Sequence, residues 1–328
     1  MSKRVVVTGG GGFIGAYLVK KLVRDGWDVG VIDTLVRGDA SRFDEVAHRV
    51  QLHSIDVRDE DAVTKAIDGA EVVMHLAAIN GTENFYKRPE LVLDVGIRGA
   101  LAVVNACRRA GVPDLVVAST AEVYQTPAVV PTPENIALML PDSLNPRYSY
   151  GGSKIASELI AFNYAQDHFR KVQVFRPHNI YGPDMGWKHV IPQFILRAAD
   201  ALDGANGPVP FAIQGDGHET RAFCYVDDVV NGILTMYEKG GHREVYHIGN
   251  DEEISIRELV DRLANAMGGA LSIEPSAAAE GGTPRRCPDL SKMRDLGYRP
   301  KVDMLEGLRR TADWYMANRG KIAANELM

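Results

Sequence analysis

Two side chains near the middle of the sequence have the types and the spacing of an acid–base pair. Tyr150 and Lys154 are four residues apart, so a helix would place them on the same face. A nearby ammonium stabilises a phenolate and lowers the pKa of the tyrosine, which allows the phenol to take a proton from a sugar or alcohol hydroxyl. The alternative is a surface aromatic residue beside a solvated lysine, so the pair needs support from its surroundings.

A glycine-rich turn near the N-terminus supplies that support. Gly9, Gly12 and Gly15 form the pattern G-x-x-G-x-x-G directly after a β-branched run and at the start of a helical pattern. This spacing allows a tight turn, close approach of the backbone to a pyrophosphate, and packing of the helix on the strand. The alternative is a glycine turn without a ligand. Here, however, strand, turn, helix and a following acidic residue occur in the order that a dinucleotide site requires.

The acidic residue, Asp33, indicates which dinucleotide is bound. It lies 24 residues after Gly9, near the roughly 20-residue offset at which a carboxylate bonds the ribose hydroxyls and repels a 2′-phosphate. NAD is therefore expected rather than NADP. Arg37 leaves an alternative open, because its guanidinium is either a ligand for a phosphate or a solvated loop charge.

The elements that must position these residues alternate along the first half of the chain. Short β-branched runs predict strands at 4–7, 28–32, 50–55, 71–76, 114–118 and 172–175. Helical patterns lie between them at 13–24, 59–67, 91–110 and 150–169. This alternation predicts an α/β fold with a doubly wound parallel sheet of the Rossmann type.

After about residue 176 the alternation gives way to loops rich in Pro and Gly, which predicts a smaller α/β substrate-binding cap. We expect the NAD-binding Rossmann domain to comprise residues 1–176 plus about 222–248. The cap is then expected over residues 177–221 and 249–328.

The composition excludes several other classes of protein. A net charge of −6 and scattered Lys and Arg residues leave no basic region for nucleic acid. The N-terminus lacks the apolar stretch of a signal peptide, and no run approaches the roughly 18 apolar residues of a membrane span. A cytoplasmic protein is therefore expected. Cys107, Cys224 and Cys287 show no paired or metal-binding spacing, so no metal site is predicted.

With these features together, the sequence resembles the extended short-chain dehydrogenase/reductases that act on nucleotide sugars, the epimerase/dehydratase family. The similarity runs nearly from end to end. The matching segments are 8–15, 56–57, 76–78, 119–124, 150–154, 176–183, 215–228 and 296–300.

The resemblance implies a set of cofactor contacts. Asp56 and Val57 would meet the adenine, and Lys154 would also hold the nicotinamide ribose beside Tyr150. The remaining residues expected to bind NAD are Gly9, Gly12, Phe13, Ile14, Gly15, Asp33, Leu76, Ala77 and Ala78. The helices at 91–110 and 150–169 resemble those through which family members form homodimers.

The resemblance also implies contacts with a nucleotide-sugar substrate. Thr120 would bond the sugar O4 alongside Tyr150, and Asn179 would bond the sugar diphosphate. Arg221 would bind the diphosphate through its guanidinium fork. A second phosphate contact would come from Arg285 or its neighbour Arg286, with a slight preference for Arg285, although a solvated pair is equally consistent with the sequence.

Four positions depart from the family pattern and leave the identity of the sugar open. Phe85 stands where a serine is usual, Gly96 where asparagine is usual, Gln125 where glycine is usual and Ala222 where aspartate is usual.

The reaction expected from the resemblance begins when Tyr150 takes the 4-hydroxyl proton and the C4 hydride passes to NAD, which gives a 4-keto sugar. Our first expectation is 4-epimerisation, which needs no further acid or base. The alternatives are a 4,6-dehydratase or a glucuronate decarboxylase that uses the carboxylate of Glu122. Ala121, however, lacks the carboxylate that some dehydratases use. An alternative of another class is a non-catalytic NAD-binding scaffold or sensor.

Overall fold

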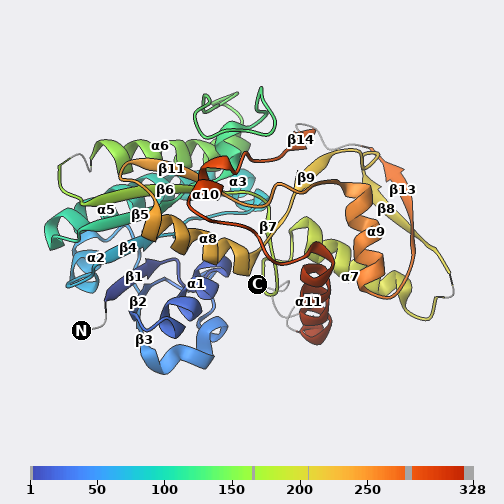
Figure 1. Cartoon of the computed structure of the whole chain (residues 1–328), viewed down its shortest axis with the longest axis horizontal. Helices are drawn as coiled ribbons and strands as arrows, with labels where there is room; N and C mark the ends of the chain where they lie inside the picture. The colour runs from blue at the N-terminus through green and yellow to red at the C-terminus, as the bar shows by residue number, and fades with distance from the viewer. Residues whose placement is uncertain (1–2, 165–166, 206, 278–282, 321–328) are drawn as a thin grey trace.

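The computed structural model describes residues 3–164, 167–205, 207–277 and 283–320. Its centre is a seven-stranded parallel sheet in the order β11-β6-β5-β4-β1-β2-β3 (Figure 1). The strands are β1 (Arg4–Thr8), β2 (Asp28–Ile32), β3 (Val50–His53), β4 (Val72–His75), β5 (Asp114–Ala118), β6 (Lys171–Pro177) and β11 (Glu244–Ile248). The predicted doubly wound parallel α/β sheet is therefore confirmed.

Helices cover both faces of this sheet, as the alternating side chains of its strands require. Val5 and Val7 pack into a core with helices α1 (Phe13–Arg24) and α8 (Val226–Lys239). Val6 points to the opposite core, which is closed by α2 (Glu60–Ala66), α5 (Gly99–Ala110) and α6 (Ser149–Asn163). The short helices α3 (Thr82–Lys87) and α4 (Pro89–Leu93) lead into α5.

The second half of the chain adds a smaller group of elements at one end of the sheet, on the right in Figure 1. Its helices are α7 (Val190–Leu202), α9 (Ile256–Ala266) and α11 (Met304–Ala317), and they share a separate apolar core. The strands there form small sheets: β7 (Ile180–Tyr181) with β10 (Cys224–Tyr225); β9 (Thr220–Ala222) between β12 (Glu253–Ser255) and β14 (Arg285–Arg286); and β8 (Val209–Gln214) with β13 (Leu271–Ser276). Helix α10 (Ser291–Asp295) packs beside β11.

After β10 the chain returns to the large sheet. Helix α8 packs on α1, and β11 pairs with β6. The domain limits given above stay a prediction.

The helix predicted over 59–67 is shorter by one residue at each end, and two others differ more from the structure. The segment 91–110 is divided by a wider π turn at Asp94–Arg98, where Gly96 lies against α6; a Cβ on Gly96 would come within 2.6 Å of the Ser153 Cβ. The helix predicted over 150–169 ends at Asn163. Phe169 is instead buried in the core beside β6, and residues 165–166 lie outside the described part.

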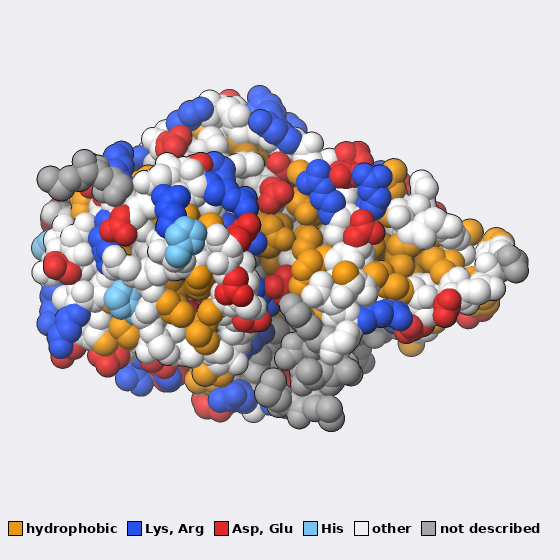
Figure 2. Space-filling view, turned by 90° about the horizontal axis from the view of Figure 1, so that it is seen from below, with side chains coloured by type: hydrophobic (Ala, Val, Ile, Leu, Met, Phe, Trp, Pro, Cys, Tyr) orange, Lys and Arg blue, Asp and Glu red, His pale blue; other side chains and the backbone are white. Residues whose placement is uncertain are grey.

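The surface seen in Figure 2 mixes Lys and Arg with Asp and Glu, without an extended area of one sign. Among the described helices, none combines the length and the apolar character needed to cross a bilayer. The three cysteines are buried and unpaired.

The turn between β1 and α1 depends on the absence of a side chain at Gly15. A Cβ there would lie 2.2 Å from the carbonyl oxygen of Gly9. We expect Gly15→Ala to lower the unfolding temperature, at a cost of about 1–3 kcal/mol for the forced backbone shift. Thermal unfolding followed by circular dichroism measures this. Gly152→Ala in α6 is the matched control, because its Cβ would make an ordinary 3.4 Å contact with Leu140; equal losses from the two changes would contradict the explanation.

Candidate active site

A cavity of about 500 Å³ opens where the carboxyl ends of the central strands meet the second half of the chain. This is the point at which the strand order changes direction, between β1 and β4, where ligands bind in sheets of this type. The cavity brings together the glycine turn and the Tyr150–Lys154 pair. Every residue expected to bind NAD lines it: Gly9, Gly12, Phe13, Ile14, Gly15, Asp33, Asp56, Val57, Leu76, Ala77, Ala78, Tyr150 and Lys154.

The glycine turn has the geometry needed to receive a pyrophosphate. Gly9 has a φ of 74°, and a Cβ there would lie 2.7 Å from the backbone nitrogen of Ala77. Gly12 is the N-cap residue of α1, and no side chain caps that end of the helix. The first backbone N–H groups of α1 are therefore open toward the cavity, where an anion is stabilised by these donors and by the helix dipole.

The carboxylate of Asp33 is held at the end of β2 by the backbone. It accepts hydrogen bonds from the nitrogen of Gly11 at 2.9 Å and from the nitrogen of Leu35 at 2.8 Å. A carboxylate offers about four acceptor positions, so the side chain keeps capacity for ribose hydroxyls. This arrangement fits NAD.

Tyr150 and Lys154 lie on one face of α6 and are only 8% and 3% exposed. The ammonium donates a hydrogen bond to the carbonyl of Ala118 at 2.8 Å and lies 6.0 Å from the centre of the Tyr150 ring. Burial lowers the pKa of Lys154 to about 8, and the charge of Glu158 acts in the opposite direction. The ammonium therefore carries its charge at neutral pH, as support for a phenolate requires.

The surroundings of Tyr150 disfavour the ionised form of its phenol. Its ring stacks on Phe85, with centroids 5.3 Å apart and planes 11° from parallel. Burial raises the pKa of Tyr150 and the charge of Glu122 adds to this, whereas a hydrogen bond with Thr120 and the charge of Arg37 lower it. The phenolate therefore depends on its neighbours for stabilisation. Phe85, one of the departures from the family pattern, contributes directly to this burial.

Thr120 and Glu122 lie in the turn that follows β5. The Thr120 hydroxyl caps this turn by accepting from the nitrogen of Glu122 at 3.2 Å. The Glu122 carboxylate forms no hydrogen bond or ion pair with the described residues, although its charge raises the pKa values of Tyr150 and Arg286. Glu122 is therefore an unbound carboxylate beside Tyr150. The structure does not show it bonded to a backbone group or an arginine.

A buried ion pair behind Lys154 was missed by the sequence reasoning. Glu158, one helical turn beyond Lys154, accepts from Ser119 and forms an ion pair with Arg176 at 2.6 Å; the two charged side chains are 6% and 4% exposed. Arg176 also donates to the carbonyl of Glu134 at 2.9 Å and to the Tyr124 hydroxyl. The position of Glu158, four residues after Lys154 on the same helical face, was the available signal.

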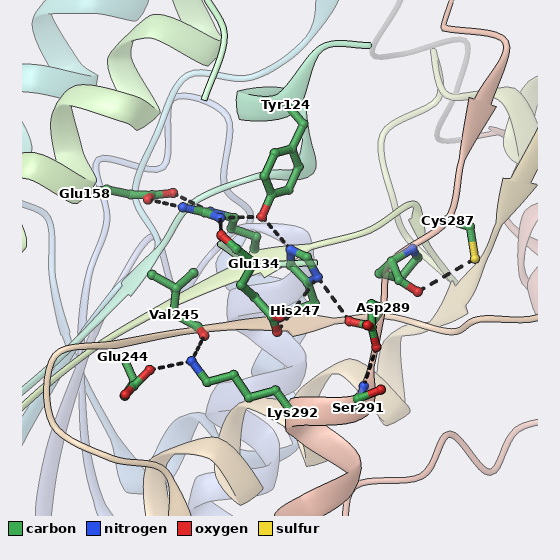
Figure 3. Close-up of polar contacts among 12 residues, drawn as sticks. Tyr124, Glu134, Glu158, Glu244, Val245, His247, Cys287, Asp289, Ser291 and Lys292 are labelled. Carbon is green, nitrogen blue, oxygen red and sulfur yellow. Dashed lines mark hydrogen bonds and ion pairs between the residues drawn. The ribbon is translucent and has the colours of Figure 1, made fainter. Parts of the chain in front are cut away.

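Figure 3 shows how these contacts continue toward the C-terminal part of the chain. The Tyr124 hydroxyl and Nε2 of His247 are 2.6 Å apart, and the His247 backbone nitrogen donates to Glu134 at 3.0 Å. Nδ1 of His247 lies 3.2 Å from the carbonyl of Asp289. The polar network thus joins α6, through Glu158 and Arg176, to the segment that follows Arg286.

The residues expected to bind the substrate lie outside the cofactor cavity. Asn179 donates to the carbonyl of Ala222 at 3.1 Å, and Arg221 donates to the carbonyls of Thr220 at 2.7 Å and Thr283 at 2.6 Å. Arg285 forms an exposed ion pair with Glu253 at 2.7 Å.

Arg286 faces the opposite way from Arg285. Strand β14 pairs with β9 so that Arg286 is opposite Arg221, and successive strand residues point to opposite sides of a sheet. Burial and the charge of Arg147 lower the pKa of Arg286, while Glu122 raises it, and the Nε atom has no partner among the described residues. The slight preference for Arg285 stays untested, but the register favours Arg286 as the guanidinium beside Glu122.

The parallel sheet, the glycine turn and the buried tyrosine–lysine pair define an NAD-dependent enzyme of the Rossmann class. A model of the NAD dependent epimerase/dehydratase family matches residues 5–249. The chain belongs to this family, which confirms the resemblance inferred from the sequence.

Known relatives carry out different reactions on nucleotide sugars. A UDP-N-acetyl-alpha-D-glucosaminuronate decarboxylase from Bacillus cytotoxicus is 28% identical over 96% of this chain and 98% of its own. A UDP-glucose 4-epimerase from Thermotoga maritima, solved with UDP-glucose, is 28% identical with a TM-score of 0.84 and covers 96% of this chain and 99% of its own. A dTDP-glucose 4,6-dehydratase from Streptomyces venezuelae, solved with NAD, is 30% identical with a TM-score of 0.84, covering 97% and 98%.

Glu158→Gln tests the buried charge behind Lys154. The change removes the carboxylate that raises the pKa of Lys154 and leaves the positive Arg176 nearby. The pKa of the ammonium is expected to fall below about 8. The alkaline limit of activity should therefore move to a lower pH than in the unchanged protein. His75, which also lies near Lys154, is neutral because burial and that ammonium lower its pKa to about 3.

The measurement is the pH dependence of kcat/KM, with the exposed Glu238→Gln in α8 as the matched control. A variant that loses thermal stability but keeps the same alkaline limit would show that Glu158 has only a structural role.

Proposed function

We propose that this protein is a nucleotide-sugar 4-epimerase that works through a 4-keto intermediate. The observation that carries the proposal is the meeting of Tyr150, Lys154 and Thr120 beside the cavity that contains the glycine turn. NAD held by the residues of this cavity would supply a reversible hydride acceptor for C4 of the sugar. The protein has to supply the proton transfer and the orientation.

The first step places the proton on Tyr150. The phenolate oxygen takes the proton of the 4-hydroxyl as the C4–H bond breaks, and the two electrons left on O4 form the carbonyl. Lys154 stabilises the phenolate through its charge, and Thr120 binds the phenol through its hydroxyl. Return of the proton from Tyr150 to O4, as C4 is reduced on its other face, would give the epimer. No other acid or base is needed.

The residues near Tyr150 argue against 4,6-dehydration. That reaction must remove the C5 proton and expel water from C6, which calls for a base and an acid. Glu122 offers one carboxylate, but Ala121 is a buried apolar residue. The acid that would protonate the leaving hydroxyl is therefore missing from this turn.

Decarboxylation of a nucleotide uronate is the second candidate, and Arg286 favours it. In a 4-keto uronate the C6 carboxylate is β to the carbonyl, so the C5–C6 bond can break with its electron pair delocalised onto O4. Such a reaction needs no acid to expel water. A buried guanidinium with an unpartnered Nε beside the free Glu122 carboxylate is suited to orient an anionic sugar. The relative from Bacillus cytotoxicus is named for a decarboxylation.

Product analysis separates these reactions. We expect the purified protein to convert one member of a panel of UDP and dTDP sugars, including UDP-glucose, UDP-glucuronic acid and dTDP-glucose, to a product of unchanged mass. Loss of carbon dioxide would replace the proposal with decarboxylation, and loss of water with dehydration. Release of NADH in stoichiometric amount would overturn all three.

Tyr150→Phe is the control for catalysis in this assay. Without the proton-accepting oxygen, turnover is expected to fall about 10²–10⁴-fold, whereas Tyr164→Phe at the exposed end of α6 leaves it unchanged. Full turnover by Tyr150→Phe would show that Tyr150 is not the proton acceptor, whereas absence of turnover by the unchanged protein on every member of the panel would favour the scaffold or sensor alternative.

Substitution of Arg285 and of Arg286 tests which guanidinium binds the nucleotide sugar. Arg286→Ala is expected to raise KM for the nucleotide sugar about tenfold or more, because a charged hydrogen bond to the substrate is worth about 1.5–3 kcal/mol. Arg285→Ala breaks the exposed pair with Glu253 and a 3.4 Å hydrogen bond to the carbonyl of Val130. It is expected to change KM less than twofold, since exposed pairs contribute little. Steady-state kinetics of the two variants compare them directly, and the reverse order would assign the contact to Arg285.

A further inference from the structure

The cationic side chains that line the cofactor cavity differ in how they are neutralised. Arg42 forms an ion pair with Asp184 at 3.0 Å, and Arg58 forms ion pairs with Asp56 and Asp94, each at 2.5 Å. Arg37 and Arg88 also line the cavity, but neither forms an ion pair within the described ranges. Arg88 is the N-cap residue of α4 and makes no side-chain hydrogen bond in the described structure. Arg37, by contrast, is held by a specific contact.

That contact carries Arg37 across the glycine turn. Arg37 lies on the loop after β2, and its Nη1 donates to the carbonyl of Asn80, on the loop after β4. Strands β2 and β4 are the two neighbours of β1 in the sheet. The guanidinium therefore bridges the loops on either side of the turn that leaves β1.

Three other side chains are close enough to Arg37 for their charges to interact with its guanidinium. Its charge acts on Tyr150 and His189, and the charge of Arg42 acts on it in turn. Arg42 donates to the carbonyl of Gly11 at 2.9 Å, within the glycine turn. The Arg37 guanidinium thus lines the same cavity as that turn and Tyr150, held by its bond to the Asn80 carbonyl. It forms no ion pair with Asp33 in the described structure.

We propose that Arg37 binds the diphosphate of the bound cofactor from the side opposite the N-terminus of α1. An NAD molecule with its ribose at Asp33 and its nicotinamide at Tyr150 has its pyrophosphate midway between them, where the helix terminus faces the cavity. A guanidinium fork matches paired phosphate oxygens. Arg37 is then neither a 2′-phosphate ligand nor a solvated charge.

A nucleotide sugar also carries a diphosphate, so the same chemistry has a second source. The cofactor is favoured because Arg37 lines the cavity that contains the glycine turn, whereas Arg221 and Arg286 lie outside that cavity. The assignment rests on NAD binding and not on the proposed reaction. Binding measurements therefore test it independently of turnover.

The experiment is calorimetric titration of NAD-free protein with NAD, NADP and UDP. Arg37→Ala is expected to raise the Kd for NAD about 10- to 100-fold, the value of a charged hydrogen bond, and to raise the Kd for NADP by the same factor. Arg37→Lys keeps the charge without the fork and is expected to lose less. The affinity for UDP stays unchanged. Arg49→Ala removes an exposed arginine outside the cavity and serves as the matched control.

Three results would overturn the proposal. An unchanged Kd for NAD in Arg37→Ala would show that the guanidinium does not bind the cofactor. A selective loss of NADP binding would assign it to a 2′-phosphate, and a loss confined to UDP would assign it to the nucleotide sugar. Arg37 makes one side-chain hydrogen bond in the described structure, so the unfolding temperature of Arg37→Ala should match that of the unchanged protein.

Discussion

The site depends on keeping a charge on a buried ammonium. Lys154 is almost inaccessible to solvent, and its removal from water favours the neutral amine. The carbonyl of Ala118 and the carboxylate of Glu158 oppose this effect. Glu158 is itself buried and is balanced by Arg176, because a buried carboxylate without a partner would be strongly destabilising. The charge on Lys154 therefore requires a second pair of charges behind it, formed by Glu158 and Arg176.

This requirement links the catalytic helix to distant parts of the chain. Arg176 closes its remaining hydrogen bonds with Tyr124 and with the backbone of Glu134, and Tyr124 continues to His247 on β11. The same network ends at Asp289, three residues beyond Arg286. Buried polar groups need such partners, so the position of Lys154 and that of the arginine-bearing strand β14 are coupled through the core.

The two halves of the site differ in how their chemistry is defined. The cofactor half is made from backbone donors, glycines and one carboxylate at the ends of adjacent parallel strands, and its geometry follows from the sheet. The half proposed to bind the substrate is made from side chains on short strands and turns, where the Glu122 carboxylate and the Nε of Arg286 have no hydrogen-bond partner among the described residues. Relatives named for three different reactions fit this division, because the residues outside the cofactor half are the ones that can discriminate among reactions.

The sequence by itself determined the sheet, the cofactor and the proximity of Tyr150 to Lys154. The strands at 28–32 and 114–118 have the predicted bounds, and G-x-x-G-x-x-G, Asp33 and the Tyr150–Lys154 spacing act through neighbouring residues. Local spacing is sufficient there, since backbone geometry converts it directly into position. The π turn at Asp94–Arg98 and the early end of α6 were missed because close packing of Gly96 on Ser153, and burial of Phe169, are not local properties.

Only the tertiary structure decided which groups in the substrate half face the site. The direction of Arg286 follows from the pairing of β14 with β9, and the bridge from Arg37 to Asn80 follows from the order of β2, β1 and β4. The partnership of Glu158 with Arg176 likewise joins a helix to a strand. Each contact joins segments that the chain brings together only on folding. A side chain's residue type shows what it can bind, whereas its partner depends on the register of the strands and the packing of the helices around it.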